Sequence, residues 1–261
     1  MSAEHFQTAL RRRLRLPLNL HGRTCGHDGH HGCRQPLDIY GDHLAACPST
    51  GLLARRAGPI ERAWTRVLRE AGARVAHKQL LRDTNVQVRN PEDQRQLDMV
   101  AYGVTSNGMA LCCDATMVSP LRRDGRPTPR AARVDGAALS RAELRKRRRY
   151  PELTNNTMGT LVVLGCEVGG RWNSDACRLV ASLAKQKARN DPFLLRQSAR
   201  AAWHNRWWGF LSVACQTALA STLCGQAVSL GGASGSDDPF LADVLESAGW
   251  SPSPSRLPLR G

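Results

Sequence analysis

The period of hydrophobic and polar positions changes several times in the middle of the chain. Apolar residues at helical spacing predict helices over residues 59–73, 137–153 and 173–188. Short apolar or alternating runs predict strands over residues 74–82, 94–102, 109–118 and 161–168. The resulting order is helix, three strands, helix, strand, helix, which predicts an α/β fold with a small mixed sheet flanked by helices.

Composition shifts divide the chain into five expected parts. In order they are a basic arm (1–20), a Gly-, His- and Cys-rich module (21–52), the α/β domain (58–190), a helical extension (191–230) and a flexible tail (231–261). The arm contains a predicted helix over residues 4–13, and residues 192–227 are predicted to form either one long helix or two. The uncharged run that begins at Trp207 has too many Ser, Thr, Gln and Gly residues for a transmembrane helix, so we expect no membrane partner.

Charge changes this picture, because the chain has 37 Lys and Arg residues against 22 Asp and Glu, a formal net charge of +15. The arginines cluster at residues 11–15, 122–133 and 141–149. Clustering favours a nucleic-acid partner over charge that is only compositional, since bound phosphates release counterions. The N-terminus becomes charged before any apolar run, so we expect no secretory signal, and the nine cysteines are expected to be reduced thiols or metal ligands.

Four candidate metal ligands follow one another as Cys25-x7-Cys33-x9-His43-x3-Cys47. Zinc prefers thiolate and imidazole ligands in tetrahedral geometry, and the last two ligands are one helical turn apart. The spacing therefore predicts a structural zinc site. The identity of the fourth ligand stays open, because His30 and His31 compete with Cys25, and His27 is also near.

Each of three strand-like segments carries one carboxylate: Asp98, Asp114 and Glu167. An unpaired buried carboxylate is costly, so it usually shifts its pKa, finds a partner or binds a metal. If residues 104–108 form a hairpin turn, Asp98 and Asp114 converge, which predicts a Mg²⁺ or Mn²⁺ site facing a polyanion. Lys146 is the only lysine among residues 141–149, and its predicted helix packs on the sheet, so its ammonium can reach the same place.

Other interpretations of these residues are structural. In these interpretations Asp98 forms an ordinary ion pair with Arg95, and Glu167 forms one with Arg171. Lys146 is then one more solvated cation of the arginine-rich helix. Trp203, Trp207 and Trp208 are more consistent with core packing than with base stacking, because they recur at helical spacing.

The order of these motifs resembles the C-terminal region of reverse-transcriptase proteins of non-LTR-type retroelements, from residue 14 to residue 223. In that family a Cys/Cys/His/Cys knuckle precedes a restriction-like endonuclease of the PD-(D/E)XK class. The resemblance rests on residues 33–47 (CRQPLDIYGDHLAAC), 95–98 (RQLD), 114–120 (DATMVSP), 167–172 (EVGGRW), and on Lys146 with Tyr150.

The resemblance implies roles for individual residues. Asp98 and Asp114 take the positions of the two metal-binding acids, and Lys146 that of the catalytic lysine in members where it has moved to the helix. Glu167 matches a recurrent acid of the next strand. Thr116 stands where the lysine usually is, and Asp93, after Pro91, is a rival for the first acid.

Together these observations predict a nuclear, Mg²⁺- or Mn²⁺-dependent endonuclease that nicks DNA, with RNA as an alternative partner. A catalytically inactive nucleic-acid-binding remnant is the alternative function. The expected phosphate contacts come from the arginine clusters, without sequence readout. They are Arg122, Arg123, Arg126, Arg130, Arg141, Arg145, Arg147, Arg148 and Arg149. The missing polymerase leads us to expect a fragment, a decayed copy or a co-opted remnant of a longer protein.

Overall fold

The computed structural model describes residues 1–26, 31–88, 90–105, 107–154, 156–225 and 244–245. The predicted flexible tail lies largely outside these residues, and the candidate zinc ligands His27 and His30 lie wholly outside them. Two tail residues, Val244 and Leu245, are described and are buried in the main core.

A mixed four-stranded sheet with the order β1-β2-β3-β4 forms the centre of the fold. Its strands are β1 (Arg74–Leu80), β2 (Gln96–Tyr102), β3 (Ala110–Val118) and β4 (Gly159–Glu167). The first three run antiparallel as consecutive hairpins, and β4 lies parallel to β3. The predicted α/β architecture, a small mixed sheet flanked by helices, is confirmed, and so is the predicted order of these helices and strands along the chain.

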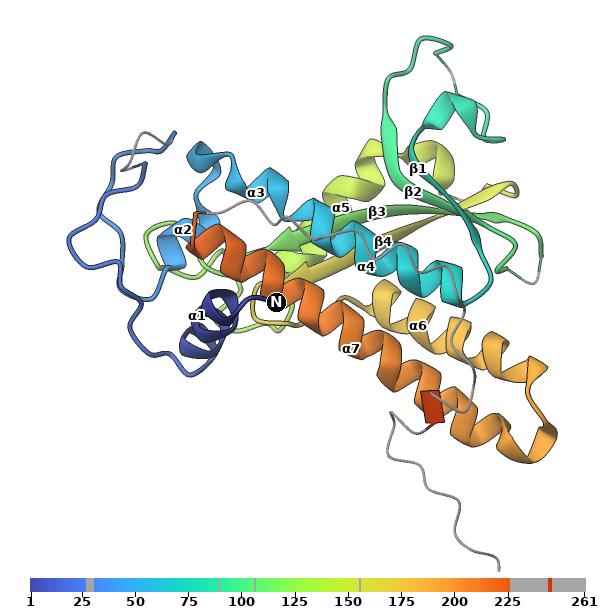
Figure 1. The fold of residues 1–261 in the computed structure, drawn as a ribbon. Coiled ribbons are helices and arrows are strands. Elements are labelled where there is room, and N and C mark those ends of the chain that lie inside the picture. Colours follow the sequence, from blue (N-terminus) through green and yellow to red (C-terminus); the bar gives the residue numbers. More distant parts are fainter. Residues whose placement is uncertain (27–30, 89, 106, 155, 226–243, 246–261) are drawn as a thin grey trace, which may run out of the picture.

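Helices cover both faces of this sheet (Figure 1). On one face lie α4 (Ala57–Glu70), α6 (Ser174–Lys187) and α7 (Arg196–Leu223), and on the other lies the crossover helix α5 (Ala137–Arg149). The larger core forms between the sheet and the first three helices, and a smaller one forms under α5. Residues of β3 contribute to both cores, so the strand is buried on both faces.

Local signals explain where these helices begin and end. Pro151 cannot continue α5, so the predicted helix 137–153 finishes as a short 3-10 turn, Pro151–Leu153. Asn173 caps α6, because its Oδ1 accepts the N–H of Ala176. Its Nδ2 also donates to the carbonyl of Val163 at 2.8 Å, which ties the start of α6 to β4.

The N-terminal part folds against the rest instead of extending as a free arm. It comprises α1 (Ala3–Arg13), α2 (Asp42–Ala46), a 3-10 turn (Pro48–Thr50) and α3 (Leu52–Arg55). Arg12 and Arg15 both pair with the buried carboxylate of Asp42, and α1 also packs against α7. Further 3-10 turns are Leu81–Asp83, Ala188–Asn190 and Phe193–Leu195.

The long helix α7 resolves the choice between one helix and two, since it continues without a break to Leu223. Trp203 and Trp207 are buried in the main core, and Trp208 packs against that core at its edge. Their role in packing agrees with the structural interpretation of these residues. Within the described parts of the chain, no helix is long and apolar enough to cross a membrane.

Candidate functional site

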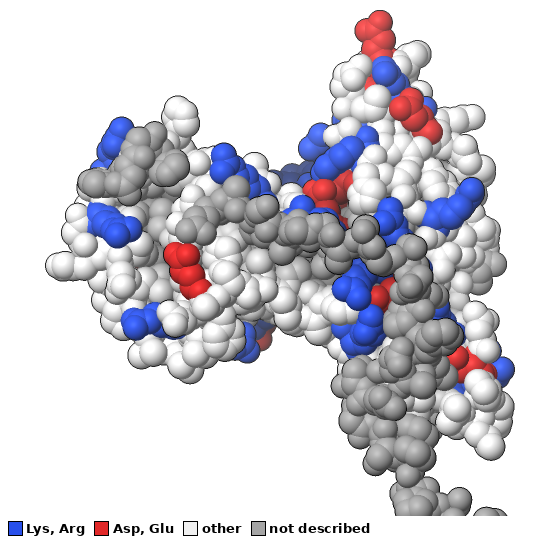
Figure 2. Space-filling view, in the orientation of Figure 1, with Lys and Arg blue, Asp and Glu red and all other residues white. Residues whose placement is uncertain are grey.

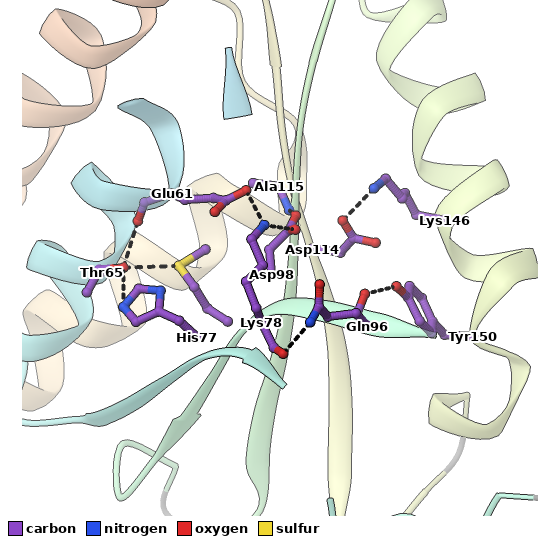
Figure 3. A network of polar contacts seen from close by, with 11 residues as sticks. Glu61, Thr65, His77, Lys78, Gln96, Asp98, Asp114, Ala115, Lys146 and Tyr150 are labelled. Atoms are coloured by element: carbon purple, nitrogen blue, oxygen red, sulfur yellow. Dashed lines mark hydrogen bonds and ion pairs between the residues drawn. The ribbon is translucent and has the colours of Figure 1, made fainter. Parts of the chain in front are cut away.

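Strands β2 and β3 separate at the point where their carboxylates lie. Their ladder pairs Met99 with Cys113 and ends there, so the next pair in register would be Asp98 and Asp114. Instead of a strand carbonyl, Oδ2 of Asp98 accepts the backbone N–H of Ala115 at 2.9 Å. The first acid therefore fills the opening between the two strands, directly beside the second acid (Figure 3).

Asp114 is 2% exposed and lies against α5. The ammonium of Lys146 is 2.5 Å from its Oδ1. Tyr150, four residues after Lys146 and directly after α5, is fully buried, and its hydroxyl donates to the carbonyl of Gln96 at 2.6 Å (Figure 3). Tyr150 thus anchors the end of α5 to β2 and holds Lys146 over the acid.

A second lysine, Lys78 of β1, completes the network on the other side. Its ammonium lies 2.8 Å from Oδ1 of Asp98 and 2.7 Å from Oε1 of Glu61 on α4. Lys78 has a positive φ of 49° in the middle of a strand, a strained conformation for a residue with a side chain. Such strain persists only where surrounding contacts enforce it, and it concentrates at functional sites.

The sequence interpretation missed both Glu61 and Lys78. Glu61 lies beside the apolar stripe of its helix formed by Ile60, Trp64 and Leu68, and it is only 8% exposed. An acid next to such a stripe is a signal that could have found it. For Lys78 the only sequence signal is its place in a strand, which does not distinguish it from a solvated cation.

The two acids have opposite pKa shifts. Burial, together with the nearby Asp98, raises the pKa of Asp114 to about 6 against the opposing charge of Lys146. Burial also disfavours ionisation of Asp98, but contacts with Asp114, Lys78 and the Ala115 N–H outweigh it and hold the pKa of Asp98 below its usual value. At mildly acidic pH the pair therefore keeps one proton, on Asp114.

Oδ2 of Asp114 is buried and, among the described residues, has no hydrogen-bond partner. The nearby carboxylate of Asp98 can satisfy it only by sharing a proton, because two ionised carboxylates both accept. A divalent cation also satisfies such an orphaned oxygen, and Mg²⁺ and Mn²⁺ prefer carboxylate ligands. Asp98 and Asp114 are therefore the residues of this network that could hold such a cation.

The structure does not bring Glu167 to this pair. In the parallel ladder Asp114 pairs with Val163 while Val118 pairs with Glu167, so Glu167 lies four residues further on, about 13 Å along the strand. Its carboxylate is 4.0 Å from the Arg171 side chain, and burial raises its pKa. The register of β4 therefore separates Glu167 from the two other strand carboxylates, and the third acid of the network is Glu61.

The rival first acid, Asp93, also lies apart from the network. It forms an ion pair with Arg95, whose guanidinium also binds Glu152 at 2.6 Å. The ion pair considered between Arg95 and Asp98 does not form, since Asp98 is held by Lys78 instead.

Cys25, Cys33, His43 and Cys47 form a compact cluster, with all four ligand atoms within 4.8 Å of one another. The Sγ atoms of Cys25 and Cys47 are 3.8 Å apart, which matches the separation of about 3.8 Å expected for two thiolates bound tetrahedrally at 2.3 Å. This group could hold a zinc ion. Among the described residues, Cys25 takes the fourth place and His31 does not.

Neighbouring groups orient the cluster. Nδ1 of His43 is 3.0 Å from the carbonyl oxygen of Arg123, which can only accept, so Nδ1 carries the proton and Nε2 is free to bind metal. Asp38 caps α2 by accepting the N–H groups of Asp42 and His43. A side chain at Gly32 would lie 2.4 Å from the carbonyl of Cys25, so the close turn of this module requires glycine.

The predicted phosphate-binding arginines are exposed, with one exception. Arg147 is half-buried and pairs with Glu143 and Asp175, so its charge is already compensated. Figure 2 shows Lys and Arg side chains gathered around the middle of one face, where acidic atoms are also visible. Exposed members are Arg122, Arg123, Arg126, Arg130, Arg141, Arg145, Arg148 and Arg149.

Comparison of the sequence with models of known protein families gives no match, and comparison with curated proteins gives none either.

Proposed function

We propose that the chain is a metal-dependent DNA endonuclease of the restriction-like class, derived from a retroelement reverse-transcriptase protein. The observation that carries the proposal is the buried Oδ2 of Asp114, which has no hydrogen-bond partner in the described parts of the chain, next to Asp98 and with Lys146 2.5 Å from the same carboxylate. Paired carboxylates with divergent pKa values and an adjacent lysine are suited to cleaving a phosphodiester.

Asp98 and Asp114 would hold Mg²⁺ or Mn²⁺, which supplies an activated water and stabilises negative charge on the phosphate. Lys146 contributes a fixed positive charge at the same point, where charge develops in the transition state. Asp114 must lose its proton before it can bind a cation, so activity is expected to rise as pH increases through about 6. The exposed arginines hold the backbone phosphates in place.

The second candidate is a nucleic-acid-binding protein without catalysis. It is favoured by the ion pairs of Lys78 with Asp98 and of Lys146 with Asp114, which already compensate both carboxylates. Thr116, at the usual lysine position, is also consistent with it.

Nicking of supercoiled plasmid by the full chain tests the proposal, with Mg²⁺ or Mn²⁺ and without added divalent ions. A chelator is avoided because it would also remove zinc. Asp114→Asn and Lys146→Met should each reduce the rate by about 100-fold or more. Asp93→Asn is the matched control and should retain activity, since its carboxylate lies outside the network.

Salt-sensitive DNA binding by the wild-type chain without nicking under any metal condition would refute the nuclease and leave the binding protein. An RNA strand of the same sequence, used as competitor, determines whether RNA shares the binding surface.

A further inference from the structure

Residues 120–128, which follow β3, form a small hairpin outside the acidic network. The N–H of Arg122 donates to the carbonyl of Arg126 at 2.8 Å, which holds the two sides of the hairpin together. Gly125 has a positive φ of 75° and makes the turn between them, a conformation that glycine adopts without strain. We call residues 120–128 the basic hairpin.

The basic hairpin presents positive charge to solvent. Arg122, Arg123 and Arg126 are exposed, and among the described residues none of the three pairs with a carboxylate. Its one acid, Asp124, is occupied within the turn, because its Oδ1 accepts the N–H of Arg126 at 3.0 Å. Closely spaced, exposed guanidinium groups without acidic partners are suited to the phosphates of a nucleic-acid backbone.

One hydrogen bond joins the tip of the basic hairpin to the Cys/His cluster. The hairpin lies beside α2, and the carbonyl of Arg123 accepts a hydrogen bond at 3.0 Å from Nδ1 of His43, which is 3% exposed (Figure 1). In the described chain, the other hydrogen bonds of residues 121–127 stay within residues 119–128. The position of the tip therefore depends on a side chain of the candidate zinc site.

A metal at the cluster fixes the tautomer that this contact needs. Without metal, the neutral ring of His43 can instead carry its proton on Nε2, which lies 3.2 Å from Sγ of Cys33. In that tautomer Nδ1 has no proton to donate, and the bond to Arg123 is lost. When Nε2 ligates a metal, the proton must stay on Nδ1, so ligation favours the contact with the hairpin.

Ligation also adds an electrostatic attraction. A metal-bound cysteine is a thiolate, and three thiolates outweigh the two charges of zinc, so the loaded cluster is an anion. Arg123 is close enough to Cys33 for its positive charge to act on the sulfur. The loaded cluster therefore attracts the side chain of the same residue whose carbonyl it binds.

We propose that zinc at the Cys/His cluster fixes the basic hairpin in place and so completes a docking surface for backbone phosphates of nucleic acid. A fixed hairpin loses less conformational entropy on binding than a mobile one, so zinc raises the affinity without contacting the ligand. The choice of nucleic acid as the ligand rests on the proposed function, whereas the coupling between cluster and hairpin does not.

Trypsin digestion of the zinc-loaded full chain, followed by mass spectrometry, measures how often the hairpin leaves the cluster. His43→Cys keeps four zinc ligands but lacks the ring donor, and its zinc content is measured in the same preparation. Cleavage after Arg122 and Arg123 should be about fivefold faster in this variant, which corresponds to the loss of one hydrogen bond. Cleavage after the exposed Arg189, in the 3-10 turn that follows α6, is the internal control and should not change.

Equal cleavage of the hairpin in the zinc-loaded wild type and in His43→Cys overturns the proposal. Equal cleavage of the wild type with and without zinc overturns it as well, and this comparison needs no variant to fold or to keep its metal.

The second arm measures binding of a short DNA duplex in zinc-containing buffer without other divalent ions. His43→Cys should bind the duplex about fivefold more weakly although it keeps every arginine. His21→Gln changes an exposed histidine of the same module outside the cluster, and it should bind as the wild type does.

Equal DNA affinity of the wild type and His43→Cys refutes the docking surface. A wild type that binds no DNA refutes both the docking surface and the proposed function. If the trypsin and DNA results hold but plasmid is never nicked, the docking surface stands and the nuclease falls.

Discussion

Replacing Asp114 by Asn removes the ionisable group whose pKa is raised most clearly in the acidic network. Burial raises this pKa from its usual 3.8 to about 6, so the folded protein binds the proton more tightly than the unfolded chain does. The stabilisation is fully present below the unfolded value and is lost as pH rises through about 6. At 1.36 kcal/mol for each pKa unit, the loss approaches about 3 kcal/mol.

The Asn side chain resembles the protonated acid and cannot ionise, so Asp114→Asn should escape this loss. We expect the variant to gain stability relative to the wild type as pH rises, by up to about 3 kcal/mol, with roughly half of the gain between pH 5 and 7.5. Asp98 does not reverse this trend, because its lowered pKa places its own contribution at more acidic pH. The same variant should lose nicking and affinity for Mn²⁺.

Urea unfolding at several pH values, in zinc-containing buffer without other divalent ions, measures the free energy of unfolding of both proteins. Subtracting one curve from the other cancels the groups that titrate equally in both. The control Asp93→Asn should show no gain with pH, since Arg95 lowers the pKa of Asp93 by hydrogen bonding. If the wild type instead becomes the more stable protein as pH rises, Asp114 is an ordinary ion-pair partner of its lysine, and the reasoning about an orphaned carboxylate is wrong.

Three further substitutions test the surrounding network, the zinc cluster and the basic surface. Lys78→Met removes the cation that bridges two carboxylates, so calorimetric titration should show Mn²⁺ binding about tenfold more tightly. The free energy of unfolding of the metal-free protein should fall by about 1 kcal/mol. Unchanged Mn²⁺ affinity would mean that the ammonium does not compete with the metal. Cys47→Ser should abolish zinc content and lower Tm by several degrees. Cys177 is exposed and lies outside the Cys/His cluster, so Cys177→Ser should change neither quantity. Equal zinc content in both variants would mean that Cys47 is not a ligand. Arg145→Gln should reduce the slope of log K against log salt for DNA binding by about 1. Arg147→Gln should change the stability of the protein more than this slope, because Arg147 is paired with acids. The reverse pattern would mean that DNA does not bind at the surface of Arg145.

Much of the fold follows from local patterns. Alternation and helical spacing identified the strands and helices in the right order. The reason is that the buried face of a strand or helix places apolar residues at a fixed short spacing along the chain. The zinc cluster could be predicted for a similar reason: His43 and Cys47 are one helical turn apart, and short loops bring the two remaining thiols to them. The hairpin that joins Asp98 to Asp114 also depends on residues close in sequence.

Contacts between distant elements could not be predicted in this way. Lys78 meets Asp98 because β1 pairs with β2, and Glu61 meets Lys78 because α4 packs across these strands. The local pattern around Lys78 does not distinguish it from a solvated cation. The distance of Glu167 from the pair depends on the parallel register of β4, which a single strand's sequence does not contain.

The sequence by itself determined the order of elements, the clusters of arginine, three of the four members of the Cys/His cluster and the two strand acids, because each depends on composition or on neighbours along the chain. Only the tertiary structure decided which charges are buried together and which are left without a partner. That outcome depends on desolvation, and desolvation is a property of packed elements, not of segments. Asp114 Oδ2 and Arg56 Nη2, which have no hydrogen-bond partner among the described residues, arise in this way, when charged side chains are enclosed by packed strands and helices.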